Sequence, residues 1–453
     1  MIQLSLNQVA TAIDAQLLGH DITFKGCSTD TRHHSLPGTL YIALRGKQFD
    51  GHDFIEAAQQ QGAVAIMVDR PVDCDLPTLR VPNTRKALGN LAHFWRQHFH
   101  LPIVAITGSN GKTTTKEMLR AIFAQQGNVL ANQGNYNNDI GVPLTLFQLH
   151  HDHHYAVIEM GANHAGEIAY LTHLAKPTVA VVTQCAPAHL DGFKDIDGVA
   201  NAKGEIFTGL STGGTAVLNT DDNYAPLWRS QIDVIRQSLS LRIDSFGLNQ
   251  PAKVTAHHIQ LNNDSSDFTL HTPQGEIAIH LPLLGQHNIL NALAASTCAM
   301  ACGCSLNTIQ QGLQSMQPVK GRLQRCAGIN HSLLIDDTYN ANPASLQAAL
   351  TILTQNPPPY WLILGDMNEL GFHSEMLHHQ AGSQARAMGV HQLCATGSMT
   401  RYAVEGFGQG ATHFGNHDDL IEYLRTHLPS QATVLIKGSR GMHMEQVVNA
   451  LRS

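Results

Sequence analysis

The segment PIVAITGSNGKTTTKEMLRAIFAQQ, residues 102–126, constrains the fold of this chain more strongly than any other. An apolar run, a short loop with two glycines and a helix-forming run follow one another directly. This order is the context that a phosphate-binding loop requires, because loop amides and the free N–H groups at a helix start point together at an anion. We expect Lys112 to reach the β- and γ-phosphates of ATP and the Thr113 hydroxyl to bind Mg²⁺. The residues predicted to bind the nucleotide here are Gly108, Ser109, Asn110, Gly111, Lys112, Thr113 and Thr114.

The match to the usual phosphate-loop pattern is imperfect. A glycine normally stands five residues before Gly111, where this chain has Ile106, and Gly108 follows two residues later. An ordinary strand-to-helix turn could also use Gly, Asn and Thr as caps. Because Gly-Lys-Thr opens the helix, we favour nucleoside triphosphate binding.

The other apolar runs predict an α/β chain of three domains. Around the loop, IVAIT, YAVIEM, TVAVVT and TAVLN read as short strands with helical segments between several of them, which predicts a doubly wound, mainly parallel sheet like that of P-loop ATPases. Beyond QSMQPVKGRLQR, the runs LLIDD, YWLILGD, HQLCATG and TVLIKGS predict a C-terminal domain of the Rossmann type. A length of 453 residues suits about three domains, and the predicted boundaries give 1–99, 100–315 and 316–453.

Composition limits the partners and the compartment. The formal net charge of −7 gives no reason to expect nucleic acid as a partner. We find no apolar run of about 18 residues, so no membrane span is expected, and the first residues do not resemble a signal peptide. Eight cysteines without a disulfide rhythm indicate a reducing compartment. We therefore expect a cytoplasmic protein, and we expect it to be a monomer.

Two clusters of possible metal ligands favour ordinary structural roles. CAMACGC places Cys298 and Cys302 one helical turn apart with Cys304 close by, a spacing that matches no usual zinc pattern and favours buried small side chains. HHDHH, at 150–154, lies between a helix and the strand YAVIEM, where a solvated loop belongs. Adjacent ligands on a short loop cannot all face one ion.

Three residues downstream of the loop suggest what the nucleotide is used for. Glu159 ends the strand in YAVIEMGANHAGEI, His189 follows the strand in TVAVVTQCAPAHLDGF, and Lys203 lies in the helical segment VANAKGEIFTGL. Taken singly, such a lysine is normally a solvated charge and such a histidine is normally structural. Glu159 is the stronger candidate, because a carboxylate at the end of an apolar strand costs solvation unless it has a cation.

The complete set of motifs closely resembles the Mur ligases of peptidoglycan synthesis. The resemblance rests on TGSNGKTTTKE, GNYNNDIGVPLTL, VIEMGANHAGEI, AHLDGF, NAKGEIF, GQHNILNALAA, IDDTYNANPASL, LGDMNELG and KGSRGMHMEQVV, which occur in order over nearly the whole chain. It implies an ATP-dependent ligase in which a substrate carboxylate attacks the γ-phosphate to give an acyl phosphate, and an amine then displaces phosphate to form an amide. The last three motifs favour the family member that joins D-alanyl-D-alanine to UDP-N-acetylmuramoyl-tripeptide. The third residue of that tripeptide stays open between lysine and diaminopimelate.

Two alternatives remain on sequence grounds. One is another carboxylate–amine ligase of the same superfamily, such as an earlier Mur ligase or a folylpolyglutamate synthase-like enzyme, against which LGDMNELG and DDTYNANP argue. The other is a nucleotide-dependent switch or a transport ATPase subunit, for which no signature is visible.

The resemblance also implies a set of catalytic residues. Lys203 falls on the family's carbamylated lysine, in which CO₂ converts the amine into an anionic metal ligand. With His189 and Glu159 it would hold a second Mg²⁺, while Thr113 and Glu159 serve the first. Arg322, in KGRLQR, would reach the γ-phosphate when the domains close, although a solvated linker arginine is the alternative. The implied catalytic residues are Lys112, Lys203, His189, Glu159 and Arg322.

Nucleotide contacts are implied in two further places. Asn288 and Asn291 lie one turn apart in GQHNILNALAA and resemble the adenine and ribose contact, although a helix cap or a hydrogen bond between helices is the alternative. Asp336 and Asp337 end a strand in LLIDDTYNANPASL, which resembles the site where the third domain closes on the nucleotide. Of the two aspartates, Asp337 is the predicted nucleotide contact.

Substrate contacts are implied in all three domains. Asparagines in GNYNNDIGVPLTL would meet the muramoyl peptide, or could simply cap the helix that follows. The loop of STDTR resembles the part of the family's UDP-binding domain nearest the pyrimidine. Arg45 and Lys47 flank a glycine where a diphosphate could also bind, although both residues are more often surface charges. The turn KGSRG, with Ser439, would bind an anion such as the dipeptide carboxylate. The predicted substrate residues are Ser28, Asp30, Thr31, Arg32, Asn135, Asn137, Asn138, Tyr339, Asn340, Lys437 and Arg440.

Overall fold

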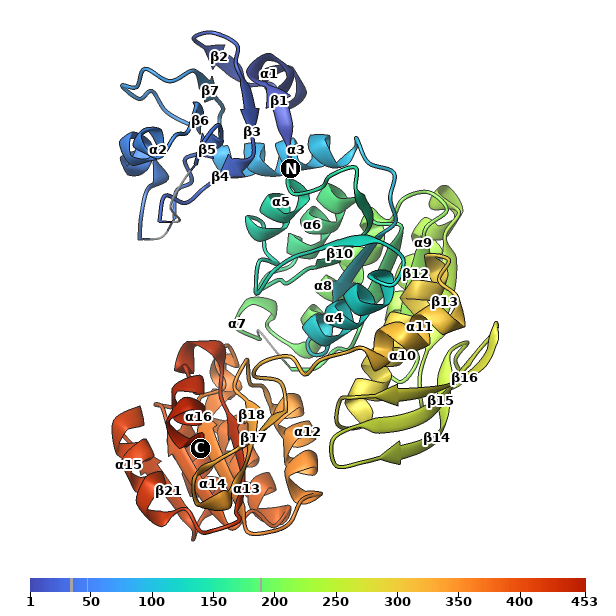
Figure 1. The fold of residues 1–453 in the computed structure, drawn as a ribbon, viewed down its shortest axis with the longest axis vertical. Helices are drawn as coiled ribbons and strands as arrows, with labels where there is room; N and C mark the ends of the chain where they lie inside the picture. Colours follow the sequence, from blue (N-terminus) through green and yellow to red (C-terminus); the bar gives the residue numbers. More distant parts are fainter. Residues whose placement is uncertain (33–35, 47, 188–189) are drawn as a thin grey trace.

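The computed structural model describes residues 1–32, 36–46, 48–187 and 190–453, and it divides into three α/β bodies that follow one another along the chain (Figure 1). The body drawn in blue contains a five-stranded sheet and a two-stranded antiparallel ribbon. Its strands, in sheet order, are β2 (Gln16–Leu18), β7 (Thr78–Arg80), β6 (Ala65–Val68), β5 (Leu40–Ile42) and β4 (Cys27–Ser28), with β1 (Gln3–Ser5) and β3 (Thr23–Lys25) in the ribbon. Its helices are α1 (Leu6–Ile13), α2 (Ile55–Gln60) and α3 (Thr84–Arg96).

The central body is built on a six-stranded parallel sheet, as the sequence predicts. Its strands, in sheet order, are β13 (Arg242–Phe246), β12 (Thr215–Asn219), β11 (Val179–Val182), β8 (Ile103–Thr107), β10 (His153–Glu159) and β9 (Asn128–Ala131). Its helices are α4 (Lys112–Phe123), α5 (Gly141–Leu146), α6 (Glu167–Ala175), α7 (Leu190–Phe193), α8 (Ile196–Gly204), α9 (Ala225–Leu239), α10 (Gln286–Ala301) and α11 (Leu306–Gln314).

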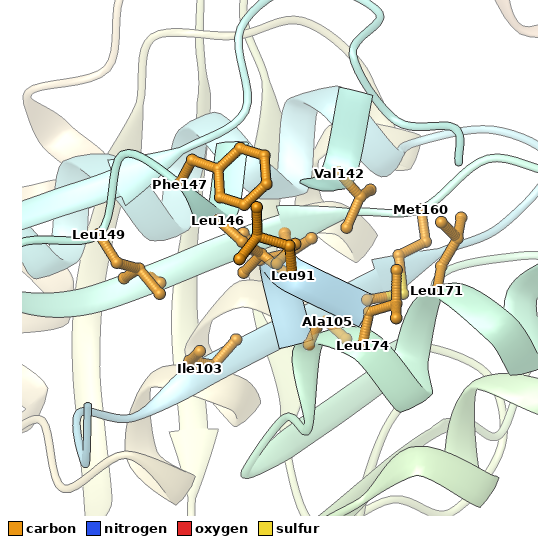
Figure 2. Packing of buried hydrophobic residues seen from close by; sticks show 14 of the residues in the cluster. Leu91, Ile103, Ala105, Val142, Leu146, Phe147, Leu149, Met160, Leu171 and Leu174 are labelled. Atoms are coloured by element: carbon orange, nitrogen blue, oxygen red, sulfur yellow. The ribbon is translucent and has the colours of Figure 1, made fainter. Parts of the chain in front are cut away.

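Strand β8 shows why these strands read as continuous apolar runs. Successive side chains of a strand point to opposite faces of the sheet. Ile103 and Ala105 pack on one face beside Leu146 and Leu174 (Figure 2), whereas Val104 and Ile106 belong to the core under α4 and α10. Helices therefore cover both faces, and neither face of the strand can be polar. Leu91 of α3 packs into the first of these cores and joins the blue body to the central one.

A three-stranded antiparallel sheet in the central body is absent from the sequence prediction. It consists of β14 (Thr255–Leu261), β15 (Ser266–Thr272) and β16 (Gly275–Leu281), at the lower right of Figure 1. Alternate residues of β15, such as Phe268 and Leu270, are buried against α10, while the residues between them are more exposed, and α11 covers the neighbouring β16. Only one face is covered, so the strands carry too few apolar residues to stand out.

The C-terminal body contains a second six-stranded sheet, and its predicted strands are confirmed. In sheet order these are β17 (Gln324–Ala327), β18 (Leu333–Asp337), β22 (Thr433–Lys437), β19 (Tyr360–Gly365), β20 (Gln392–Thr396) and β21 (Ala411–Phe414). Only β17 runs antiparallel to its neighbour. Its helices are α12 (Pro343–Thr354), α13 (Ser374–Ala387), α14 (Thr400–Phe407), α15 (His417–His427) and α16 (Glu445–Leu451). Within the described ranges of the chain, no helix is both long and apolar enough to cross a membrane.

Candidate active site

The glycine loop between β8 and α4 is shaped by close backbone approaches that only glycine permits. Gly108 has φ +152°, and a Cβ there would lie 1.9 Å from Thr183 Oγ1. Gly111 has φ +81°, and a Cβ there would lie 2.3 Å from Asn291 Oδ1. Both positions combine a left-handed backbone with a side-chain contact, so any larger residue would displace the loop. The loop departs from the usual glycine spacing, yet Gly108 and Gly111 still allow the tight backbone turn between β8 and α4.

The loop is hydrogen-bonded to the segment that follows β11. Ser109 N donates to Gln184 O at 2.7 Å, and Ser109 Oγ donates to Ala186 O at 2.8 Å. Lys112 Nζ folds back to donate to Gly108 O at 2.6 Å. Burial lowers the pKa of the Lys112 ammonium, and the charge of Glu159 opposes this shift. The lysine side chain therefore lies against the backbone of its own loop, beside the free N–H groups at the start of α4, which suits an anionic ligand.

Glu159 ends β10 beside this loop and is only 2% exposed. Its Oε2 accepts the Thr113 hydroxyl at 2.9 Å, and its Oε1 accepts Asn137 Nδ2 at 2.9 Å. The cluster supplies carboxylate, hydroxyl and amide oxygens, which are the donor types that Mg²⁺ takes. The residues present therefore fit a magnesium ion.

Lys203 lies near the C-terminal end of α8 and is 6% exposed. Burial, together with the nearby Lys112 charge, lowers the pKa of the Lys203 ammonium to about 7. A lysine of this kind is not the ordinary solvated charge that a helix usually carries, and part of its population is a neutral amine near neutral pH. His189, the other predicted ligand on this side, lies outside the described residues.

A cavity of about 410 Å³ opens beside the loop, between the carboxyl end of β12 and the start of α10. Residues that line it include Asn219, Asp222, His287 and Leu290, none of which the sequence analysis selected. The predicted Asn288 and Asn291 lie on the same helix but are engaged within the protein. Asn288 Nδ2 donates to Leu284 O at 2.8 Å, and Asn291 Nδ2 donates to Asn288 Oδ1 at 3.2 Å.

Arg322 reaches this site from the segment that leads into the C-terminal body. Its Nη2 donates to Thr113 Oγ1 at 2.9 Å, and its guanidinium lies 4.2 Å from the centre of the Tyr339 ring. Tyr339 N in turn donates to Gly321 O at 3.0 Å. Arg322 is therefore an oriented side chain facing the glycine loop, not a solvated linker residue.

The carboxyl ends of β18 and β22 contribute a buried ion pair. Lys437 is 1% exposed, and its Nζ donates to Asp337 Oδ2 and, at 3.0 Å, to Asn340 O. His287, on α10 of the central body, lies near this ion pair, and burial lowers the pKa of its imidazole to about 4. Arg440 behaves differently from Lys437, because it is largely exposed and lies 3.3 Å from Glu445.

A direct hydrogen bond joins the glycine loop to the C-terminal body. Asn342 caps α12 by accepting Ser345 N at 2.9 Å, and its Nδ2 donates to Asn110 Oδ1 at 2.8 Å. Thr183 Oγ1 donates to Asn110 O at 2.6 Å from the opposite side. Asn342 belongs to the motif that resembles the closure site, but its pairing with Asn110, 232 residues away, could not be predicted.

The remaining predicted substrate residues lie on two loops. Asn135 is exposed, while Asn138 Oδ1 accepts Gly141 N at 2.9 Å and Ile140 N at 3.2 Å in the turn that leads into α5, a structural role close to the capping alternative. In the blue body, Asp30 forms an ion pair with Arg32 at 2.6 Å, and Ser28 Oγ donates to Asp30 O at 2.9 Å.

Thr31 O accepts Gln61 Nε2 at 2.7 Å in the same loop. Arg45 forms an ion pair with Asp69 at 2.8 Å, and Lys47 lies outside the described residues.

Comparisons with known proteins agree along the whole chain. Three family models match: the catalytic domain of the Mur ligase family over residues 23–96, the Mur ligase middle domain over 106–299, and the Mur ligase glutamate ligase domain over 321–440. UDP-N-acetylmuramoyl-tripeptide–D-alanyl-D-alanine ligase of Escherichia coli is 44% identical, with 100% of this chain and 99% of that protein covered.

Two solved structures show the same arrangement of the chain. A crystal structure of MurF from Acinetobacter baumannii superposes with a TM-score of 0.93 at 36% identity, covering 99% of this chain and 98% of that one. MurF ligase from Thermotoga maritima in complex with ADP gives a TM-score of 0.82 at 25% identity, covering 94% and 96%.

Proposed function

Because the chain belongs to the Mur ligase family, we propose that it joins D-alanyl-D-alanine to UDP-N-acetylmuramoyl-tripeptide with hydrolysis of ATP, in peptidoglycan precursor synthesis. The observation that carries the proposal is the convergence of the glycine loop, Glu159 and Arg322 at Thr113, because it brings a phosphate-type loop, a carboxylate suited to Mg²⁺ and an arginine of a second domain to one point. Similarity at 44% identity over the full chain favours this reaction over those of other ligases in the superfamily.

The chemistry requires activation of a carboxylate. A free carboxylate is a poor electrophile at neutral pH, and transfer of the γ-phosphoryl group to it creates an acyl phosphate with a good leaving group. Lys112 and the loop amides bind the phosphates, and Arg322 stabilises the negative charge that develops during transfer. The dipeptide amine then attacks the acyl carbon, and the carbon–oxygen bond to phosphate breaks.

Magnesium would be held by the oxygen cluster at Glu159. Thr113 and Glu159 are the proposed ligands of one ion, and Glu159, His189 and Lys203 are those of a second. Bound Mg²⁺ neutralises phosphate charge and orients the γ-phosphoryl group. The chain's own part is to hold the Glu159 carboxylate in place through hydrogen bonds from Thr113 and Asn137.

Carbamylation is the proposed state of Lys203. A neutral amine adds to CO₂ and loses one proton, which leaves an anionic carbamate with two oxygens. The pKa of about 7 makes the neutral amine available at cellular pH, whereas an ordinary lysine is almost fully protonated there. This shift supports the carbamate, and it also explains how a buried cation beside Lys112 is avoided.

The adenosine part of ATP is proposed to enter the cavity beside α10. The wall of the cavity includes Gln184, whose carbonyl oxygen accepts Ser109 N of the glycine loop, and it offers both polar groups and the apolar Leu290. Asn288 and Asn291 would act mainly by shaping this helix, because their amides are engaged within the protein. Asp337 approaches the nucleotide from the C-terminal domain, oriented by Lys437.

The two organic substrates are proposed to come from opposite sides. The loop at Ser28, Asp30, Thr31 and Arg32 would bind the UDP part of the donor, and the asparagine loop 135–138 would bind its muramoyl peptide. Tyr339, Asn340, Lys437 and Arg440 form the proposed side for the dipeptide, with Arg440 as the exposed cation. We propose domain limits of 1–99, 100–315 and 316–453 and a cytoplasmic monomer.

The proposal is tested by its product. Purified protein given UDP-N-acetylmuramoyl-tripeptide, D-alanyl-D-alanine, ATP and Mg²⁺ is expected to yield the pentapeptide product by mass spectrometry. Phosphate release is expected to require both the carboxylate donor and the amine. Equal product without any nucleoside triphosphate would contradict the proposal, and phosphate release by nucleotide alone would favour an ATP-driven switch.

A second prediction concerns the contact between Asn342 and Asn110. Replacing Asn342 by alanine is expected to lower kcat/KM for ATP about fivefold, because it removes one net hydrogen bond between the C-terminal domain and the glycine loop. Asn416 caps α15 by accepting Asp419 N at 2.9 Å and provides a matched control.

Both alanine variants are expected to lose about 1 kcal/mol of unfolding free energy in urea, as for any lost helix cap. Only the Asn342 variant should lose activity. An equal kinetic effect in the two variants would contradict a role for the contact in closure.

A further inference from the structure

Lys116 is a buried lysine with no role in the reaction described so far. It lies one helical turn after Lys112 on α4 and is 1% exposed. Its Nζ donates to Asn132 O at 2.8 Å and lies 3.8 Å from Glu159 Oε2 and 3.4 Å from Glu117 Oε1. Lysine is rarely buried so completely unless its charge is matched, so these partners account for its position.

Asn132 connects the same carboxylate residue to the asparagine loop. It follows β9 and is 3% exposed. Its Oδ1 accepts Glu159 N at 2.9 Å, and its Nδ2 donates to Glu159 O at 2.8 Å and to Tyr136 O at 2.9 Å. The Asn132 side chain therefore holds both the end of β10 and the loop 133–138, which begins directly after Asn132.

We propose that Lys116 and Asn132 form a brace that positions the loop 133–138 and Glu159 for the carboxylate donor. Both are positioning residues, because they act through the loop and through Glu159. The inference rests on the proposed function, since it takes the muramoyl peptide as the ligand of this loop.

Two features of the geometry support the brace. Lys116 holds the main chain of Asn132, and Asn132 holds the main chain of Tyr136, so the loop is anchored at both of these residues. Asn137, the next residue, donates to Glu159 Oε1 at 2.9 Å. Loss of either anchor would release this amide from the carboxylate.

Lys116 also compensates the charge of the buried Glu159 carboxylate. The Glu159 carboxylate is almost fully buried, and a buried carboxylate without a cation is strongly unfavourable. Lys116 Nζ lies 3.8 Å from Glu159 Oε2 and forms an ion pair with it. It can therefore keep the carboxylate in place before any nucleotide or metal arrives.

The test measures binding, so that it does not depend on turnover. We expect Lys116→Met and Asn132→Ala each to raise the Kd of UDP-N-acetylmuramoyl-tripeptide about tenfold in calorimetry without ATP or Mg²⁺. The Kd of ADP without Mg²⁺ is expected to stay within about twofold, because the glycine loop is untouched. Lys116→Arg keeps the positive charge and should bind the donor more tightly than Lys116→Met. Lys86→Met, at an exposed position on α3, should leave the Kd of the donor and of ADP unchanged.

The two affinities separate positioning from stability. ADP binding also reports folding, and Asn132→Ala provides the same test if Lys116→Met does not fold. Unchanged donor affinity in the folded variants, or equal weakening of donor and ADP, would overturn the brace. Wild-type protein that fails to bind the donor would overturn the proposed function and the brace together, whereas normal wild-type binding with unaltered variants would overturn the brace alone.

Discussion

Replacing Lys203 by alanine is expected to lower kcat by about a thousandfold or more, a loss of roughly 4 kcal/mol of transition-state stabilisation. The side chain is buried near Lys112, and in the proposed state its carbamate supplies two oxygens to a metal ion. Alanine cannot form a carbamate, so added bicarbonate should not restore activity. Initial-rate assays with and without bicarbonate test this, and ADP binding by the variant shows that the glycine loop is still folded.

The pH dependence of the wild-type protein gives an independent test of the same residue. Only the neutral amine reacts with CO₂, and its fraction rises as the pH passes upward through about 7. Protein depleted of CO₂ is therefore expected to recover activity faster at about pH 8 than at about pH 6, at constant dissolved CO₂. Recovery that is independent of pH over this range, or full activity of Lys203→Ala, would contradict the carbamate.

Most of the fold could be predicted because the two main sheets are covered on both faces. Strands such as β8 and β12 are fully buried, and a fully buried strand has to be a continuous apolar run. The antiparallel sheet could not be found in this way. Its strand β14 reads TAHHIQL, and most of its residues are partly or fully exposed. Such a weak alternation of apolar and polar residues cannot be distinguished from the sequence of a polar loop.

The candidate site could be predicted where its residues are close in sequence. The glycine loop, Thr113 and Glu159 follow from short motifs at strand ends, and the structure brings them within hydrogen-bond distance. Contacts between domains could be predicted only in part. The family resemblance implies that Arg322 approaches the glycine loop, but nothing in the sequence pairs Asn110 with Asn342.

Lys116 shows a different limit of sequence analysis. In the sequence it reads as one more charged residue on an amphipathic helix, and only its 1% exposure separates it from a solvated lysine. Burial of this kind depends on β9 and β10 lying beside α4, which is a property of the assembled sheet.

Replacing Arg322 by alanine is expected to lower kcat about a thousandfold, the range seen when an arginine that stabilises phosphoryl transfer is removed. The KM for ATP should change much less, because Lys112 and the loop amides still bind the phosphates. Arg322→Lys should recover only part of the loss, since an ammonium keeps the charge but lacks the planar fork that both stacks on Tyr339 and reaches Thr113.

Arg386 offers a matched control for this variant, because it also lies over an aromatic ring, 5.4 Å from the centre of Phe407, in the same domain. Arg386→Ala should lose a similar stacking contact, about 1 kcal/mol of stability, without a change in kcat. Steady-state kinetics with varied ATP, combined with thermal unfolding of both variants, separates the two effects. If Arg322→Ala kept kcat within about threefold of the wild type, the arginine would act on the position of the domain and not on the transferred phosphoryl group.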